Sequence, residues 1–197
     1  MSDVAGVKRQ IRRATIDRIL AMPRSQRDEE DAALAERFPR LPGWQKSRSI
    51  LLYARAFPEE IETEPFLKIT LDAGKRLVCP RVDRRSKSLK LFEIGDPSND
   101  FEVGTLGIPE PRTSCPAVDP TEVDWVLVPG LAFDSRGYRV GRGAGHYDRL
   151  LPKLRDDVLC WALIYDAQWF DELPVEPHDV PVDGVVSRSR SFGLDLD

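Results

Sequence analysis

The feature that most constrains the fold of this chain is the stretch Asp124–Leu151, in which a strand, a glycine-rich loop and a helix follow one another. The apolar run Trp125–Val128 is typical of a buried strand, and a proline and a glycine end it. A polar turn at 134–137 and a loop at 141–145 then lead into a helical pattern over 146–154. Proteins build anion sites from this order of elements.

The loop Gly141-Arg142-Gly143-Ala144-Gly145 has the chemistry of an anion site. Glycine lets backbone N–H groups approach an oxyanion closely, and the first N–H groups of a helix point at it. Arg139 and Arg142 add positive charge. The spacing is neither GxxxxGK[ST] nor GxGxxG, so we expect neither a Walker P-loop nor a dinucleotide site. The plainer alternative is a glycine-rich turn before a surface helix.

This stretch resembles the signature of the 5-formyltetrahydrofolate cyclo-ligase (5,10-methenyltetrahydrofolate synthetase) family. The family pattern is roughly LPG-x-x-F-D followed by R-x-G-x-G-x-G-[YF]-Y-D, which stands here as residues 128–134 and 139–148. The chain departs from the family at His146, where the family usually has Tyr or Phe, and also at Ala144. The resemblance covers nearly the whole chain, in four ordered segments.

Composition narrows the class of protein. The chain has 197 residues, 41% hydrophobic and 31% charged, which predicts one soluble domain over 1–197. A net charge of -4 argues against nucleic-acid binding, and no apolar run approaches membrane-spanning length. Three widely spaced cysteines, an odd number, favour a reducing compartment without disulfides. With no signal peptide recognised, we expect a cytoplasmic protein that is a monomer or a weak homodimer.

The remaining pattern predicts an α/β fold. A strand at 49–54, a helix at 63–73 and a strand at 76–82 form a strand–helix–strand unit, which implies parallel pairing. Other expected elements are helices at 3–21 and 25–38, strands at 87–94 and 158–165, and a rigid proline-rich loop at 107–111. We therefore expect a single domain with a mixed, mainly parallel sheet and helices on both faces. The resemblance implies the cyclo-ligase fold.

The first helix carries a basic pair. Lys8 and Arg12 are four residues apart and share one face, which on the sequence alone is more typical of a solvated basic surface than of a binding site. The segment Lys8–Arg12 is similar to the K-x-x-[LI]-R helix that opens the cyclo-ligase family, and this implies contact with ATP phosphates. Arg9 and Arg13 are better explained as solvated.

Three acids are candidates on the strength of the resemblance. Glu60 matches the second acid of a [DE]-E-[IV]-[DE]-T segment that contacts the folate in the family. Asp148 and Asp179 match the acids that hold Mg²⁺, a hard cation that prefers carboxylates and water. On the sequence alone, Glu60 fits a solvated turn, Asp148 a helix N-terminus and Asp179 a turn.

The resemblance implies an ATP-dependent cyclisation of 5-formyltetrahydrofolate to 5,10-methenyltetrahydrofolate, with release of ADP and phosphate. Lys8, Arg142 and Asp148 are the expected catalytic residues, and Glu60, His146 and Tyr147 the expected folate contacts. The nucleotide would contact Lys8, Arg12, Arg139, Gly141, Arg142, Gly143, Ala144, Gly145, His146 and Tyr147. Two alternatives remain: a binding protein for reduced folate or nucleotide without turnover, and a sugar-phosphate isomerase or transferase that does not use ATP.

His146 allows a separate prediction. It lies at a helix N-terminus and near Arg142, and both disfavour a positive imidazolium. We expect a neutral ring that stacks or donates one hydrogen bond and does not act as an acid–base catalyst. The alternative is a solvated loop histidine without a role.

Overall fold

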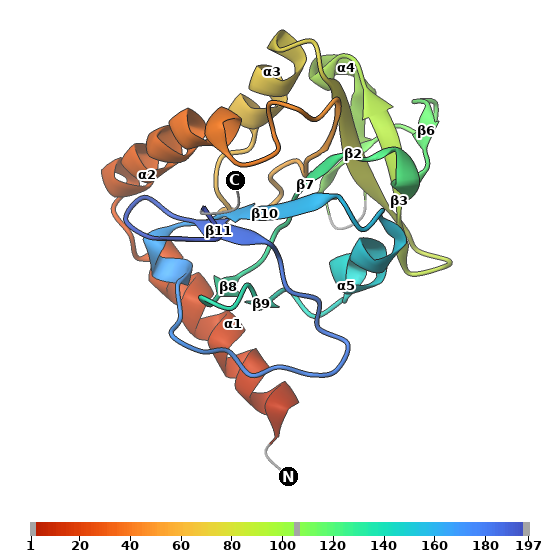
Figure 1. Cartoon of the computed structure of the whole chain (residues 1–197). Helices are drawn as coiled ribbons and strands as arrows, with labels where there is room; N and C mark the ends of the chain where they lie inside the picture. Colours follow the sequence, from red (N-terminus) through yellow and green to blue (C-terminus); the bar gives the residue numbers. More distant parts are fainter. Residues whose placement is uncertain (1–2, 105–106, 195–197) are drawn as a thin grey trace.

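The computed structural model describes residues 3–104 and 107–194, which fold around one mixed sheet (Figure 1). Five of its strands run parallel, and three antiparallel strands complete the edges. In sheet order the strands are β12 (Ser191–Phe192), β11 (Gly184–Val186), β10 (Leu159–Leu163), β7 (Trp125–Leu127), β1 (Ser49–Leu51), β2 (Arg76–Asp83), β3 (Ser88–Ile94) and β6 (Ala117–Val118). The expected mixed, mainly parallel sheet is confirmed.

The central strands are apolar throughout because both faces of the sheet are covered. Successive side chains on a strand point to opposite faces, so Ile50 and Trp125 enter one core cluster while Leu51 and Val126 enter the other. Asp124 joins the amino ends of two neighbouring strands, because its Oδ2 accepts the backbone N–H groups of residues 48 and 49 at 3.0 Å each. Cys79, Cys115 and Cys160 are free and buried.

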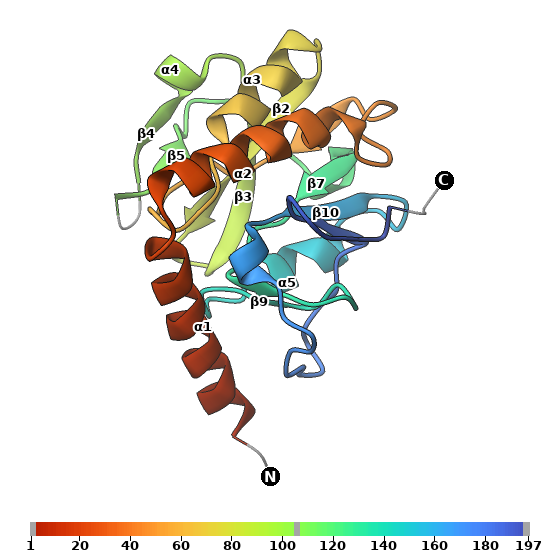
Figure 2. The ribbon, with the colours of Figure 1, turned by 90° about the vertical axis from the view of Figure 1, so that its left-hand side faces the viewer.

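Helices pack on both faces of the sheet (Figures 1 and 2). Ile19, Leu34 and Phe66 bring α1, α2 and α3 into the first core cluster, while Leu150 brings α5 into the second. The helices are α1 (Val4–Leu20), α2 (Arg24–Arg37), α3 (Glu64–Asp72), α4 (Pro97–Asp100) and α5 (His146–Leu150). None of the helices in the described part of the chain is long and apolar enough to cross a membrane.

Three predicted boundaries are wrong. The helix expected over 146–154 ends at Leu150 and continues as a 3₁₀ turn, Leu151–Lys153, because Pro152 has no N–H to extend an α-helix. The strand expected over 49–54 leaves the sheet after Leu51. The segment 107–111 is not only a loop, since β5 (Pro109–Pro111) pairs with β4 (Phe101–Val103) as a separate two-stranded sheet. Proline is tolerated there because the strand is an edge.

A second small hairpin positions the loop of interest. β8 (Ala132–Phe133) pairs with β9 (Arg139–Val140), and Ile11 of α1 packs against this hairpin. Gly137 turns the hairpin with a φ of 80°, and its carbonyl accepts the N–H of Val182 at 2.9 Å. This hydrogen bond therefore holds the segment that contains Asp179 against the β8–β9 hairpin, which leads into the glycine loop.

We expect Gly137→Ala to destabilise the fold by about 3 kcal/mol for two reasons. Alanine is unfavourable at a left-handed φ, and its Cβ would also clash with a neighbouring carbonyl. A Cβ at this position would lie 2.3 Å from the carbonyl oxygen of Val182. Gly74→Ala is the matched control, since Gly74 has a φ of +67° and no atom within 4 Å of the added Cβ. It should cost only about 1 kcal/mol. Urea unfolding of both variants measures the difference, and equal losses would contradict the proposed clash.

Candidate functional site

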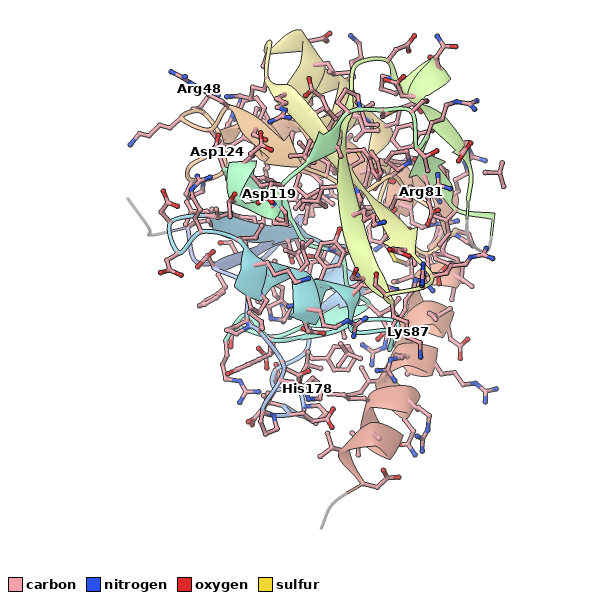
Figure 3. The ribbon with its side chains drawn as sticks, turned by 90° about the vertical axis from the view of Figure 1, so that its right-hand side faces the viewer. Arg48, Arg81, Lys87, Asp119, Asp124 and His178 are labelled. Atoms are coloured by element: carbon pink, nitrogen blue, oxygen red, sulfur yellow. The ribbon has the colours of Figure 1, made fainter. Side chains whose placement is uncertain are left out.

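A cavity of about 310 Å³ lies at the carboxyl edge of the parallel strands, where open α/β sheets bind ligands. The loops after β1 and β7 line it, together with α1, the glycine loop and the loop that carries Asp179. Figure 3 shows Lys87 and His178 at this end of the molecule and Arg48 and Asp124 at the opposite, amino end of the strands. All residues predicted from the sequence line the cavity: Lys8, Arg12, Glu60, Arg139, Gly141, Arg142, Gly143, Ala144, Gly145, His146, Tyr147, Asp148 and Asp179.

Lys8 enters the cavity wall from α1 and is almost fully buried. Its Nζ lies 2.5 Å from Asp179 Oδ2 and 2.9 Å from Glu176 Oε2. Burial by itself lowers the pKa of Lys8, but the hydrogen bonds and charges of the two carboxylates outweigh it and raise the pKa above its usual value. Lys8 is therefore charged, and two acids from the far end of the chain neutralise it.

Arg12, one turn further along α1, contacts the glycine loop. Its Nε donates to the carbonyl of Gly141 at 2.7 Å, and its guanidinium group lies beside Gly143. Lys8 and Arg12 thus share the face that the sequence predicts, and that face is turned inward to the cavity.

Arg139 is buried and holds Asp148. Its Nη2 donates to Asp148 Oδ1 at 2.6 Å, and its Nη1 donates to the carbonyl of Val180. Burial lowers the pKa of the Arg139 guanidinium from its usual value, while the negative charge of Asp148 opposes the shift. Arg139 and Asp148 were predicted for two different roles, and the structure pairs them.

The backbone of the glycine loop is open to the cavity. Gly143 and Gly145 adopt left-handed φ angles of 101° and 64°, which glycine tolerates. Ala144 between them does not have a positive φ. Across residues 3–104 and 107–194, no acceptor takes the N–H groups of residues 142–145. These donors remain available for an anion, as predicted. The following helix is only five residues long, so its dipole adds less than a helix to residue 154 would.

Arg142 faces a loop whose importance the sequence does not reveal. Its Nη2 lies 2.8 Å from Glu59 Oε1 and 3.4 Å from Glu60 Oε1, and its guanidinium lies 3.5 Å from the ring centroid of Phe57. The other carboxylate oxygen of Glu60 accepts the N–H groups of Ala56 and Phe57. Glu59 is next to the predicted residue Glu60 and Phe57 lies three residues before it, but no periodicity marks either side chain as inward-facing.

His146 has the lowered pKa that the sequence predicts, for partly different reasons. Burial is the largest cause, and the charge of Arg149 is the second. The Nδ1 atom lies 3.2 Å from the carbonyl of Lys87 and 3.3 Å from Arg149 Nη2. The neighbouring cation that matters is therefore Arg149 and not Arg142. A neutral imidazole beside Lys87 fits this environment.

Tyr147 lines the cavity, and its hydroxyl is buried and lacks a hydrogen-bond partner in the part of the chain that the structure describes. Burial raises the pKa of this phenol, so it is protonated and can donate a hydrogen bond. An unpaired buried hydroxyl is unfavourable, and a ligand atom that accepted from it would relieve that cost.

One group of described residues has the geometry of metal ligands. Glu176, His178 and Asp179 each offer an atom within 4.8 Å of the others. Asp179 was predicted as a ligand, whereas Asp148 does not belong to this group and is paired with Arg139. The cavity has a less polar end lined by Pro80, Val82, Leu89, Ile108 and Pro109, and the buried carboxylate of Glu110 also lies there.

The sequence profile of the 5-formyltetrahydrofolate cyclo-ligase family matches residues 4–188. This chain belongs to that family. The cyclo-ligase of Mycolicibacterium smegmatis is 31% identical, with 94% of this chain and 95% of the relative covered. The Escherichia coli K12 cyclo-ligase is 29% identical, with 86% and 94% covered. The solved structure of Aquifex aeolicus 5,10-methenyltetrahydrofolate synthetase superposes with a TM-score of 0.83 at 30% identity, over 96% of this chain and 93% of that one.

We expect the imidazole of His146 to titrate with a midpoint below 6.5, the value of an unperturbed histidine. The chain contains only two histidines, so NMR resolves both, and His178→Gln assigns the signals. Because the unfolded chain binds this proton more tightly than the folded one, the same group lowers stability as pH falls below about 6.5. A midpoint above 6.5 would show that a carboxylate, not Arg149, controls the ring.

Proposed function

We propose that this protein catalyses the ATP-dependent cyclisation of 5-formyltetrahydrofolate to 5,10-methenyltetrahydrofolate, with release of ADP and phosphate. The observation that carries the proposal is the gathering of four cationic side chains around unpaired loop N–H groups, beside an apolar compartment. Lys8, Arg12, Arg139 and Arg142 supply the positive charge for a triphosphate. The apolar end and Glu60 suit a flat heterocycle with N–H donors.

The chemistry explains why such a site is needed. The formyl group on N5 is an amide, so its carbonyl carbon is a poor electrophile and its oxygen a poor leaving group. Transfer of the γ-phosphoryl group to that oxygen breaks the bond to ADP and solves both problems. N10 then attacks the formyl carbon, and the oxygen leaves as part of phosphate when the ring closes. The protein has to align oxygen with phosphorus and neutralise charge, and no protein nucleophile is required.

The roles follow from position in the cavity. Lys8, Arg142 and Asp148 are the proposed catalytic residues, because they surround the open donors of the glycine loop. Glu60, Tyr147 and His146 are the proposed folate contacts, and the phenol of Tyr147 is a donor without a partner in the described residues. The proposed nucleotide site consists of Lys8, Arg12, Arg139, Gly141, Arg142, Gly143, Ala144, Gly145, His146 and Tyr147.

Asp148 and Asp179 are the proposed ligands of Mg²⁺. Both are carboxylates on the cavity wall, and Glu176 lies beside Asp179, so the donor set suits a hard cation. When bound, the ion supplies positive charge to phosphate oxygens. Each of the two carboxylates is paired with a cation that is itself a proposed phosphate ligand: Asp179 with Lys8, and Asp148 with Arg139. If phosphate and metal ion bound together, the phosphate would pair with Lys8 and Arg139, and the metal ion with Asp179 and Asp148.

Turnover measured by absorbance, with 5-formyltetrahydrofolate in the presence and absence of ATP, tests the proposal. We expect formation of 5,10-methenyltetrahydrofolate only with ATP. Binding without turnover would favour the non-catalytic alternative. Turnover of a sugar phosphate without ATP would favour the isomerase or transferase alternative, and either result overturns the proposal.

Lys8→Ala is expected to weaken ATP binding by roughly 1.5–3 kcal/mol, because a charge-assisted contact to phosphate is lost. Binding of 5-formyltetrahydrofolate should change much less. Calorimetric titration of each ligand measures both effects. Arg9→Ala is the matched control, since Arg9 is a largely exposed cation on the same helix. Unchanged ATP affinity in Lys8→Ala would remove Lys8 from the nucleotide site.

Asp148→Asn and Asp179→Asn should each raise the Mg²⁺ concentration needed for half-maximal activity, because a neutral amide is a poorer ligand for a hard cation. His178→Gln is the control, because His178 lies beside Asp179 and its imidazole is a ligand that Mg²⁺ does not favour. Activity is measured across a Mg²⁺ titration. If a substitution lowered activity by the same factor at limiting and at saturating Mg²⁺, the altered residue would not be a metal ligand.

A further inference from the structure

The guanidinium of Arg142 is held by the loop that follows β1. Glu59 Oε1 lies 2.8 Å from its Nη2, and the ring of Phe57 lies under it with 3.5 Å between guanidinium carbon and ring centroid. Glu60 Oε1 is more distant, at 3.4 Å from both Nη2 and Nε. One strong ion pair and one stacking contact thus fix the plane of this guanidinium.

Arg142 needs such support because its own backbone gives it little. Glycines stand on both sides of it, and Gly143 has a φ of 101° that few other residues adopt. A loop of this kind restrains a long side chain poorly. Orientation of the guanidinium therefore has to come from the groups that it touches, and the closest of these are Glu59 and Phe57.

Glu59 is unusual for an acid on a loop, because it is only 5% exposed. A buried carboxylate is unfavourable unless a charge or hydrogen bonds compensate it, and Arg142 provides that charge. Arg142 is more exposed than its partner, with a third of its side chain accessible. The acid is therefore on the inside, and the guanidinium stands between it and the cavity.

This arrangement leaves part of the guanidinium available. Within residues 3–104 and 107–194, no acceptor takes the N–H groups of Arg142 Nη1. Glu59 occupies Nη2, and Phe57 covers one face of the plane. An anion in the cavity can then approach Nη1, whose direction the other contacts determine.

We propose that Glu59 is a positioning residue: with Phe57 it orients Arg142 so that the Nη1 donors meet the phosphoryl group, and it acts only through Arg142. The proposal rests on the proposed function, because it takes the anion to be a phosphate of ATP. It gives Glu59 and its neighbour Glu60 different tasks. Glu59 serves the nucleotide side through an arginine, while Glu60 serves the folate side directly.

A double-mutant cycle with Glu59→Gln and Arg142→Ala tests this inference. Glutamine keeps the shape of Glu59 and removes its charge. We expect Glu59→Gln alone to lower kcat/KM for ATP at least tenfold, with a change of less than threefold in the KM for 5-formyltetrahydrofolate. In the Arg142→Ala background, the same substitution should change kcat/KM by less than twofold, because the residue through which Glu59 acts is gone.

Two variants serve as references. Phe57→Leu keeps apolar bulk and removes the aromatic face, so it should affect ATP in the same direction as Glu59→Gln and by a smaller factor. Glu62→Gln is the matched acid control, because Glu62 belongs to the same loop, is about half exposed and pairs with Arg55 instead of Arg142. It should leave both kinetic parameters within twofold of those of the unaltered protein.

Stability gives a readout independent of activity. Arg142→Ala leaves the Glu59 charge buried without a partner, so its unfolding temperature should fall, and adding Glu59→Gln should recover part of the loss. Equal loss of kcat/KM from Glu59→Gln in both backgrounds, or no loss from Glu59→Gln alone, would overturn the positioning role. An unaltered protein that fails to turn over 5-formyltetrahydrofolate with ATP would instead overturn the proposed function.

Discussion

The ion pair between Lys8 and Asp179 joins residues that are 171 positions apart, and the cavity depends on it. It fastens the first helix to the last long loop of the chain, and the glycine loop lies between them. Because both groups are largely buried, removing Lys8 would leave the charge of Asp179 without this partner, and breaking a buried pair in this way typically costs about 3–5 kcal/mol. Arg12 strengthens the junction by donating to the backbone of the glycine loop. The site is therefore assembled from both ends of the chain.

Three of the four cations of the site, all but Arg12, are paired with carboxylates before any ligand arrives. Asp179 neutralises Lys8, Asp148 neutralises Arg139, and Glu59 neutralises Arg142. This arrangement lets three cations face one cavity without strong mutual repulsion. An anion that bound without a metal ion would have to compete with a carboxylate for each of these three cations. A nucleotide accompanied by a divalent cation fits better, because the displaced carboxylates then acquire a positive partner of their own.

The parallel sheet supplies the rigid frame for this site. Its central strands are buried on both faces, so their carboxyl ends are fixed, and the loops that leave them bring Glu59 and the glycine loop to one edge. The β8–β9 hairpin adds a second support, since Gly137 holds the segment near Asp179 and Ile11 of α1 packs on the same hairpin. Long side chains such as Arg142 thus extend from a backbone held by the core.

The sequence by itself indicated the main helices and the longer strands of the sheet, and it predicted an anion site at the glycine loop. Both are local: apolar runs such as Trp125–Val128 define strands, and glycines flanked by arginines define an anion loop, whatever surrounds them. The sequence also marked Lys8 and Arg12 as one face of a helix. Its apolar spacing, however, did not identify the buried face, since Val7 remains 42% exposed while Lys8 is buried.

Only the tertiary structure decided the partner of each charge. Local patterning carries no information about contacts between positions far apart, such as Lys8 with Glu176 or Arg142 with Glu59. It likewise did not show that Arg149, rather than Arg142, lowers the pKa of His146. The sequence shows which residues are charged, but the partner of each buried charge depends on which loops the folded sheet brings together.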